Sequence, residues 1–437
     1  MEKAVKKPPC LITAVVSNKE GKIFELPGYA AVGMEGRSLL PLKLNETIHT
    51  PFGSELMFLP DRKPILFNIC TDSYEILTEN PQMPGEAIFP VAVFNSPGYV
   101  LSCVSAYQEK KNAGYLPLFS YGAVGWHKGC FRSAAIRIDR ERRQDLRLMN
   151  KDKMIVGIKN MRKKMPKNRL RMHLETCALT YGCPAGKNFF LKRYEAPLPT
   201  SESCNARCLG CISSQKTGDI PTSQERISFR PSPEEIAEVA LEHIQNVHKG
   251  IVSFGQGCEG DPLLSADAIE PAIRSIRSKT KKGTININTN GSRPDILKQL
   301  FSAGLDSVRI SMNSVRKKCY HAYFRPNGYT FSDVTESIAV AGREKKFISI
   351  NYLNTPGFTD TPEEIEALLA FIKRHEINMI QWRNLNFDPV RYLKIMGGVS
   401  KQGKPIGIKN LFDLVKKSFP GLKNGYFNPP KEKFTLL

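Results

Sequence analysis

The sequence predicts an α/β fold in which a partial, TIM-like (β/α)6 barrel follows a β-rich N-terminal domain. Short apolar runs divided by Gly, Pro and Asn fill residues 1–150, as expected for strands joined by turns. Across residues 193–390, strand-like runs alternate six times with helix-like segments, a pattern typical of parallel strands with right-handed crossovers. We place a basic, helical connector at 151–192 and a C-terminal extension at 391–437.

The composition fits a globular chain of 437 residues, of which 41% are hydrophobic. No apolar run approaches the ~20 residues of a membrane span, and the N-terminus lacks the pattern of a signal peptide. We therefore expect a cytoplasmic protein without a membrane span. In that compartment the eleven cysteines are expected to be metal ligands, reactive thiols or core residues rather than disulfides.

The formal net charge is +21, and its densest local source is the acid-free segment 159–171. A run of this kind is most often a solvated linker or helix face, which is the interpretation we favour. The alternative is a surface for an anionic partner such as RNA.

Helix start signals support the barrel region. Ser232 and Glu235 form the pattern of a capping box with Pro233 at the first helical position, and Thr361 and Glu364 repeat it. A first strand is expected in KRYEAPLP. The later strands are expected at 251–257, 284–290, 307–313, 348–354 and 378–386.

Four of these strands alternate polar and apolar residues, although buried parallel strands are usually apolar on both faces. An antiparallel sheet with one wet face would alternate in the same way, but the intervening helices disfavour it. The polar faces should therefore line a filled cavity inside the barrel. The residues expected to line it are Asn288, Arg309, Ser311, Asn351 and Arg383. A guanidinium there needs an acidic partner or an anionic ligand, so Arg309 and Arg383 predict that the cavity binds an anion.

Three cysteines follow the first strand with C-x3-C-x2-C spacing: Cys204, Cys208 and Cys211. Three thiolates can hold three irons of a [4Fe–4S] cluster and leave the fourth iron open to another ligand. Zinc is the alternative, but it would need a fourth Cys or His nearby, and the sequence has no second CxxC motif.

These residues resemble the radical S-adenosylmethionine (SAM) superfamily, over about residues 194–390, with no subgroup identified. The resemblance implies that SAM binds the open iron and that an electron from the cluster cleaves it to methionine and a 5′-deoxyadenosyl radical. The radical would then abstract hydrogen from a substrate. The resemblance also implies a reductant such as ferredoxin or flavodoxin.

The resemblance extends to single residues of the SAM site. Gly260, Asp261 and Pro262 match the turn after the second strand, with Asp where the family commonly has Glu. Polar residues of the later strands match positions that contact SAM. Together the expected cofactor-binding residues are Gly260, Asp261, Pro262, Asn288, Ser311, Asn313 and Asn351. Gly210 departs from the family, which commonly has an aromatic residue before the third cysteine, and this puts base stacking at that point in doubt.

The expected catalytic residues are Cys258, Arg309 and Arg383. Cys258 lies within the SAM-turn motif, while Cys177 and Cys183 precede the barrel and could hold a second cluster or be plain core residues. Three functions stay open. We favour a radical SAM enzyme acting on an unidentified small molecule, peptide or protein, the alternatives being an RNA-modifying enzyme or a non-catalytic iron–sulfur or zinc protein on the same fold.

Overall fold

The computed structural model describes residues 10–142, 145–215 and 220–434. They form two compact units, each built from separate stretches of the chain. The first comprises Met1–Ile138, Asn354–Ile365 and Asn384–Leu414, and the second comprises Asp139–Leu353, Glu366–Arg383 and Val415–Leu437. The domain limits expected at residues 150, 192 and 390 stay predictions. Within the described ranges, every helix is too short or too polar to cross a membrane.

Antiparallel strands dominate the first unit, as its short apolar runs predict. The strands are β1 (Thr13–Ser17), β2 (Ile23–Ala30), β3 (Val32–Glu35), β4 (Ser38–Pro41), β5 (Ile48–His49), β6 (Glu55–Phe58), β7 (Arg62–Asn68), β8 (Ser73–Ile76), β9 (Glu79–Asn80), β10 (Met83–Ala87), β11 (Phe89–Phe94), β12 (Tyr99–Leu101), β13 (Val104–Ser105), β14 (Tyr107–Glu109), β15 (Val124–His127), β16 (Cys130–Ser133) and β17 (Ala135–Arg137). The largest sheet runs in the order β14-β7-β2-β1-β15-β16-β5, with β11 also paired to β1. Val16 of β1 and Val93 of β11 are fully buried.

A buried ion-pair network joins the later stretches of this unit to its strands. Arg62 is 1% exposed, and its guanidinium donates to Glu109 at 2.7 Å and to Asp388 at 3.1 Å. Asp388 also caps α10 (Pro389–Gly397) by accepting from the backbone of Val390 and Arg391. Because a buried guanidinium is costly without partners, these contacts hold residues 384–414 against the strands.

Glu35 makes the stability of the first unit depend on pH. Burial, followed by the negative charge of Asp360, raises the pKa of Glu35 to about 7. Its Oε1 accepts from the Cys103 thiol at 3.6 Å. Since the folded state then binds the proton more tightly than the unfolded state, stability should fall as the pH rises from about 4.5 to 7.

We expect Glu35→Gln to raise the melting temperature by a few degrees at pH 8, because glutamine is never charged. The gain should shrink towards zero below about pH 4, where Glu35 is largely protonated in both the folded and the unfolded state. Thermal unfolding followed by circular dichroism tests this, with the exposed Glu20→Gln as control. An equal gain at both pH values would show that burial of the charge is not the cause.

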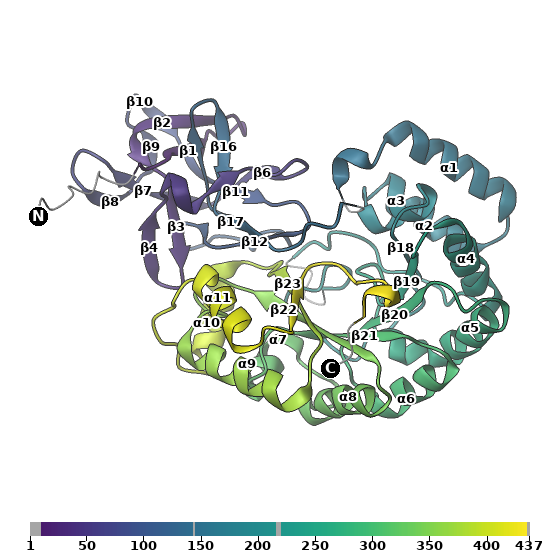
Figure 1. Ribbon diagram of the computed structural model, residues 1–437. Coiled ribbons are helices and arrows are strands. Elements are labelled where there is room, and N and C mark those ends of the chain that lie inside the picture. The colour runs from purple at the N-terminus through teal and green to yellow at the C-terminus, as the bar shows by residue number, and fades with distance from the viewer. Residues whose placement is uncertain (1–9, 143–144, 216–219, 435–437) are drawn as a thin grey trace, which may run out of the picture. The chain divides into compact units, whose positions relative to one another are not determined.

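The second unit contains the predicted parallel sheet. Its strands are β18 (Glu195–Pro197), β19 (Ile251–Phe254), β20 (Thr284–Thr289), β21 (Ser307–Met312), β22 (Phe347–Asn354), β23 (Met379–Asn384) and β24 (Lys423–Gly425), which pair in chain order. The described pairings between β18 and β22, and between β23 and β24, are parallel. Figure 1 shows this sheet curled into a half-barrel with helices along its outer side. The predicted α/β fold with a β-rich N-terminal region is therefore confirmed.

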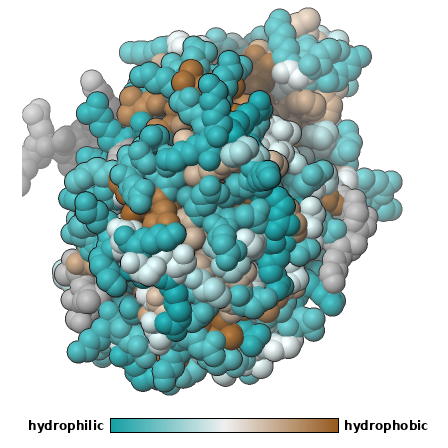
Figure 2. Space-filling view, turned by 90° about the vertical axis from the view of Figure 1, so that its right-hand side faces the viewer, coloured by the Kyte–Doolittle hydropathy of each residue, from teal (hydrophilic) through white to brown (hydrophobic). Residues whose placement is uncertain are grey.

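The described helices are α1 (Lys151–Lys164), α2 (Arg169–Leu179), α3 (Pro184–Phe190), α4 (Pro233–Asn246), α5 (Ala266–Lys279), α6 (Pro294–Ala303), α7 (Lys317–Phe324), α8 (Phe331–Arg343), α9 (Pro362–His375), α10 and α11 (Ile408–Ser418). Two of them, α4 and α9, begin at the start signals seen in the sequence. The capping box of Ser232 and Glu235 begins α4 as predicted. Hydrophilic residues cover most of the face shown in Figure 2, which is the side of α1, α2, α4 and α5.

Strand register brings the predicted polar rows together. Asn288 of β20 lies beside Arg309 of β21, and Ser311 of β21 lies beside Asn351 of β22. The intervening apolar residues Ile287 and Ile310 are fully buried towards the helices. Adjacent strands thus present polar side chains to the same interior side of the half-barrel, as the alternation predicts.

Candidate functional site

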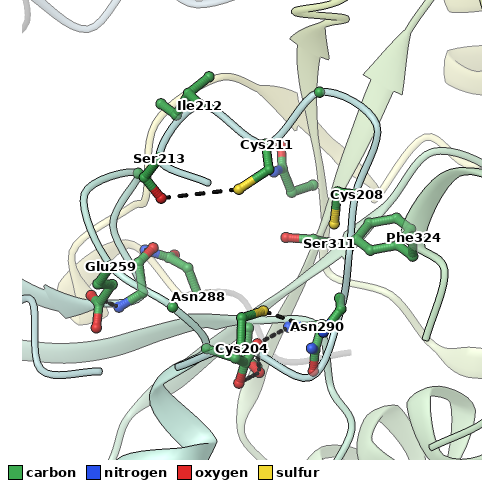
Figure 3. Close-up of a pocket in the computed structure, with 18 of the residues that line it drawn as sticks. Cys204, Cys208, Cys211, Ile212, Ser213, Glu259, Asn288, Asn290, Ser311 and Phe324 are labelled. Atoms are coloured by element: carbon green, nitrogen blue, oxygen red, sulfur yellow. Dashed lines mark hydrogen bonds between the residues drawn. The ribbon is translucent and has the colours of Figure 1, made fainter. Parts of the chain in front are cut away.

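A cavity of about 310 Å³ lies in the second unit, where the cysteine loop meets the later strands (Figure 3). Nine of the predicted site residues line it: Cys204, Cys208, Cys211, Gly260, Asp261, Asn288, Arg309, Ser311 and Asn351. Most of them lie at or near the carboxyl ends of the parallel strands, where ligand sites of such sheets occur. Five of the seven residues expected to bind a cofactor therefore share one cavity with the three expected to bind a metal.

The three loop cysteines direct their sulfur atoms towards this space from different sides (Figure 3). Burial, followed by the negative charge of Asp261, raises the pKa of Cys204 to about 12. Burial also raises the pKa of Cys208, followed by repulsion from its neighbouring thiols. Thiols in this setting become good ligands when a cation compensates their charge. The site is therefore suited to a metal group rather than to free thiolates.

The turn after β19 approaches the cysteine loop very closely at Gly260. Its N–H donates to Ser201 O at 2.6 Å, and a Cβ built on it would lie 1.8 Å from Ser203 O. Only glycine allows this approach. The turn and the start of the cysteine loop are thereby held in one arrangement.

Asp261 connects this turn to the end of β20. Its buried carboxylate accepts from the Thr289 hydroxyl at 2.8 and 3.0 Å, from Asn290 N at 2.7 Å and from Leu263 N at 3.1 Å. Burial raises its pKa, while these donors favour the charged form. Because its oxygens are occupied by the protein, Asp261 positions the turn instead of offering a free ligand.

Glu259, the alternative to Asp261 in the sequence of this turn, has a comparable role. Its two oxygens accept from four backbone N–H groups, those of Thr200, Ser201, Gly255 and Gln256, at 2.7–3.0 Å. Burial raises the pKa of Glu259 to about 7, opposed by these amides. The side chain joins the ends of β18 and β19 beneath the cavity.

Two residues that line the cavity from β21 and β22 carry buried polar atoms without protein partners. Among the described residues, Arg309 Nε and Asn351 Oδ1 have no hydrogen-bond partner although both atoms are buried. Arg309 Nη1 donates to Gln381 Oε1 at 3.0 Å, and burial followed by repulsion from Arg383 lowers the pKa of Arg309 to about 9. Buried polar groups are normally satisfied, so these atoms point to a polar, anion-bearing ligand.

Four predicted residues are not among those lining this cavity. Pro262 begins a short 3-10 helix, and Asn313 donates to Cys319 O at 3.1 Å. Arg383 was expected in the cavity, but its guanidinium lies 3.7 Å from the centre of the Tyr426 ring and stacks on it. Cys258 lies against α2 with His173 and Cys177.

Two aromatic residues of α7 line the cavity that no sequence motif indicated, Tyr323 and Phe324. Their backbone carbonyls accept from Leu209 N at 3.1 Å and Arg207 N at 2.8 Å, which holds α7 against the cysteine loop. Phe324 lies beside Cys208 in Figure 3. These rings supply an apolar wall near the thiols, where Gly210 offers none.

Comparison with known proteins gives one family and a set of distant structures. The model of the radical SAM superfamily matches residues 198–372, and no curated protein matches. Native anSMEcpe with bound AdoMet is 21% identical, with a TM-score of 0.37, over 52% of this chain and 62% of that one. The chain thus spans less than two thirds of anSMEcpe. Methylornithine synthase PylB is 13% identical, with a TM-score of 0.38, over 64% and 74% of the two chains. Streptococcus suis SuiB is 13% identical, with a TM-score of 0.37, over 73% and 72%.

Proposed function

Since residues 198–372 carry a domain of the radical SAM superfamily, we propose that this chain is an iron–sulfur enzyme that cleaves SAM reductively. The observation that carries the proposal is the convergence of three thiols and two unpartnered polar atoms on one cavity. When bound there, a [4Fe–4S] cluster supplies the electron that splits SAM into methionine and a 5′-deoxyadenosyl radical, which abstracts hydrogen from the substrate. The electron comes from a reductant such as ferredoxin or flavodoxin.

The residues present fit these two cofactors. Cys204, Cys208 and Cys211 offer three thiolates for three irons, which leaves one iron for SAM. SAM carries an amino group, a carboxylate and ribose hydroxyls, and the cavity offers partners for each kind. Asn351 Oδ1 can accept from a donor of SAM, and Arg309 can bind a carboxylate.

The chain's own part in the reaction is to bind, orient and exclude water. Gly260 and Asp261 fix the turn against the cysteine loop, so that backbone groups face the cofactor. Tyr323 and Phe324 shield the thiols on one side and reduce the access of water. In this proposal Arg309 and Asn351 hold the polar end of SAM, of the substrate, or of both. Ser311 and Asn288 complete the polar wall.

A small molecule, peptide or protein is the substrate class we favour over RNA. The basic segment 159–171, which motivated RNA, is largely engaged within the second unit. Its ion pairs are Arg162–Glu175, Lys164–Glu242, Arg169–Glu235 and Arg171–Glu175. Cations that are already paired with carboxylates have less charge to offer to phosphates. The segment therefore fits a solvated helix face better than a nucleic-acid surface.

The test is SAM cleavage by anaerobically reconstituted protein. With dithionite and SAM it should release 5′-deoxyadenosine, even slowly and without substrate, as measured by liquid chromatography and mass spectrometry. Protein reconstituted without iron should release none. Absence of 5′-deoxyadenosine from protein that holds a full cluster would favour a non-catalytic iron–sulfur protein on the same fold.

Asp261→Ala should weaken SAM binding by about tenfold or more. The change leaves the Thr289 hydroxyl and the N–H groups of Asn290 and Leu263 buried without their acceptor, so the turn should loosen. Anaerobic equilibrium dialysis with labelled SAM measures the affinity, with Asp267→Ala on the exposed surface of α5 as control. Unchanged affinity in folded, cluster-bearing Asp261→Ala protein would show that Glu259 alone holds the turn.

A further inference from the structure

A second cluster of metal-ligating side chains lies outside the cavity just described. His173 and Cys177 are four residues apart on α2 and so share one face of that helix, which packs against the turn carrying Cys258. One ligand atom from each of the three lies within 4.8 Å of the other two. Cys177 and Cys258 are 2% and 5% exposed. A buried thiol alone is an ordinary core residue, but three converging donors of two kinds are not.

We propose that His173, Cys177 and Cys258 bind a structural zinc ion, with Cys183 as the fourth ligand. A tetrahedral zinc with Zn–S of ~2.3 Å and Zn–N of ~2.1 Å separates nitrogen and sulfur by about 3.6 Å. The distance between His173 Nε2 and Cys177 Sγ is 3.5 Å, which matches that edge. Nitrogen and thiolate donors in a tetrahedral arrangement are the ligands that zinc takes in structural sites.

Cys183 is placed for the fourth position by the loop between α2 and α3. Its backbone N–H donates to Cys177 O at 3.0 Å, and it occupies the N-cap position of α3 without a side-chain hydrogen bond there. Gly186 in α3 packs so closely on α2 that a Cβ there would lie 3.3 Å from Cys177 Cβ. Cys183 is half-buried and lies outside the group of three converging donors, so this loop has to move for its sulfur to become the fourth ligand.

The spacing favours a single ion over a second iron–sulfur cluster. In a cubane cluster each sulfur ligand binds a different iron, so the cluster core separates the ligands further than one ion does. Here one donor atom of each of the three residues lies within 4.8 Å of the other two, which is closer than the thiolates of a cubane cluster are expected to lie. The three donors therefore suit a single metal ion better than a second cluster.

The zinc would connect helices α2 and α3 to the turn that carries Cys258 and that lines the cavity at Gly260. Cys258 is two residues before Gly260 in the turn beside the cysteine loop, and its carbonyl accepts from Ile227 N at 2.8 Å. His173, Cys177 and Cys183 precede the residues that match the radical SAM family. A metal shared between them would hold α2 and α3 against the turn and limit its movement.

Metal analysis of anaerobically purified protein tests the proposal. Wild-type protein should contain about one zinc ion per chain besides about four irons. The triple variant Cys204→Ala, Cys208→Ala, Cys211→Ala should lose the iron and keep the zinc. Cys177→Ala, Cys258→Ala and His173→Ala should each lose zinc by at least about fivefold, and His173→Cys should regain it because thiolate also binds zinc. Buried Cys319→Ala serves as the matched control.

Cobalt provides a measurement that needs no variant. Zinc-depleted wild-type protein should take up about one Co²⁺ with the intense visible bands of tetrahedral thiolate ligation. Three results would overturn the proposal: wild-type protein without zinc or thiolate-bound cobalt, about eight irons of which half depend on Cys177, or a Cys177–Cys258 disulfide found by peptide mapping. Failure of SAM cleavage would leave the zinc result untouched, because the two sites lose their metals independently.

Discussion

Replacing Cys204, Cys208 and Cys211 together by alanine should abolish both the iron–sulfur absorption and the release of 5′-deoxyadenosine. Iron should fall from about four per chain to nearly none, because no other thiols line the cavity among the described residues. The fold should survive, since the loop is held by contacts that do not use sulfur. Leu209 N and Arg207 N bond to α7, and the turn at Gly260 bonds to Ser201 O.

A second triple variant provides the control. Cys10, Cys70 and Cys130 belong to the first unit and are exposed or half-buried, so changing them to alanine removes the same number of thiols elsewhere. This protein should keep about four irons and full SAM cleavage. If the loop variant kept its iron, or if both variants lost the same amount of iron, the three loop cysteines would not be the ligands of the cluster.

Much of the fold could be predicted because its signals are local. Ser232 and Glu235, only three positions apart, predict where α4 begins. The alternation of polar and apolar residues around Asn288 and Ile287 predicts which face of β20 each side chain occupies. The three cysteines are also close to one another in sequence, and the structure gathers them at one cavity with Gly260, which a separate turn motif marked. Their roles as ligands stay predictions until iron and SAM are measured.

What the sequence did not predict depends on contacts between distant segments. The alternation places Arg383 correctly on its strand, but it does not indicate that Tyr426 from the C-terminal extension stacks on the guanidinium. Similarly, β24 joins the sheet as a seventh strand with only three residues, too few for a periodic pattern. Tyr323 and Phe324 line the cavity through the placement of α7, which no motif marks.

The grouping of His173 with two cysteines also depends on a contact between distant segments. A histidine on a helix is usually an ordinary residue, and from the sequence alone Cys177, Cys183 and Cys258 are only thiols without an assigned role. The structure adds that His173 shares its helix face with Cys177 and meets Cys258 from a turn more than eighty residues away. Spacing along the chain cannot reveal a ligand set that is completed by such a distant segment.

Arg309→Leu should lower SAM cleavage or substrate turnover by at least about tenfold, equivalent to ~1.4 kcal/mol in the transition state. Arg309 lines the cavity, and among the described residues it forms no ion pair with a carboxylate. Its pKa of about 9 leaves it charged at neutral pH, although burial and the charge of Arg383 both oppose that state. A cation in this position is best stabilised by an anionic ligand, so its loss should weaken ligand binding.

The melting temperature of Arg309 variants distinguishes a role in ligand binding from a structural role. Removing a poorly compensated buried charge should leave the melting temperature of Arg309→Leu equal to or above that of wild type, while activity falls. Arg309→Lys should recover part of the activity, since it keeps the charge but not the hydrogen bond to Gln381. Arg383→Leu should have the smaller effect, because Arg383 does not line the cavity and its guanidinium stacks on Tyr426.

The pH dependence of ligand binding gives an independent measure of the same charge. Because the positive form of Arg309 is lost as the pH rises through about 9, affinity for SAM should decline above that pH in wild-type protein. Arg309→Leu should bind SAM weakly at pH 7.5 and show no further decline. If Arg309→Leu instead kept full affinity and turnover with an intact cluster, the anionic group would have to be held elsewhere, and the polar face of β21 would be no more than a scaffold.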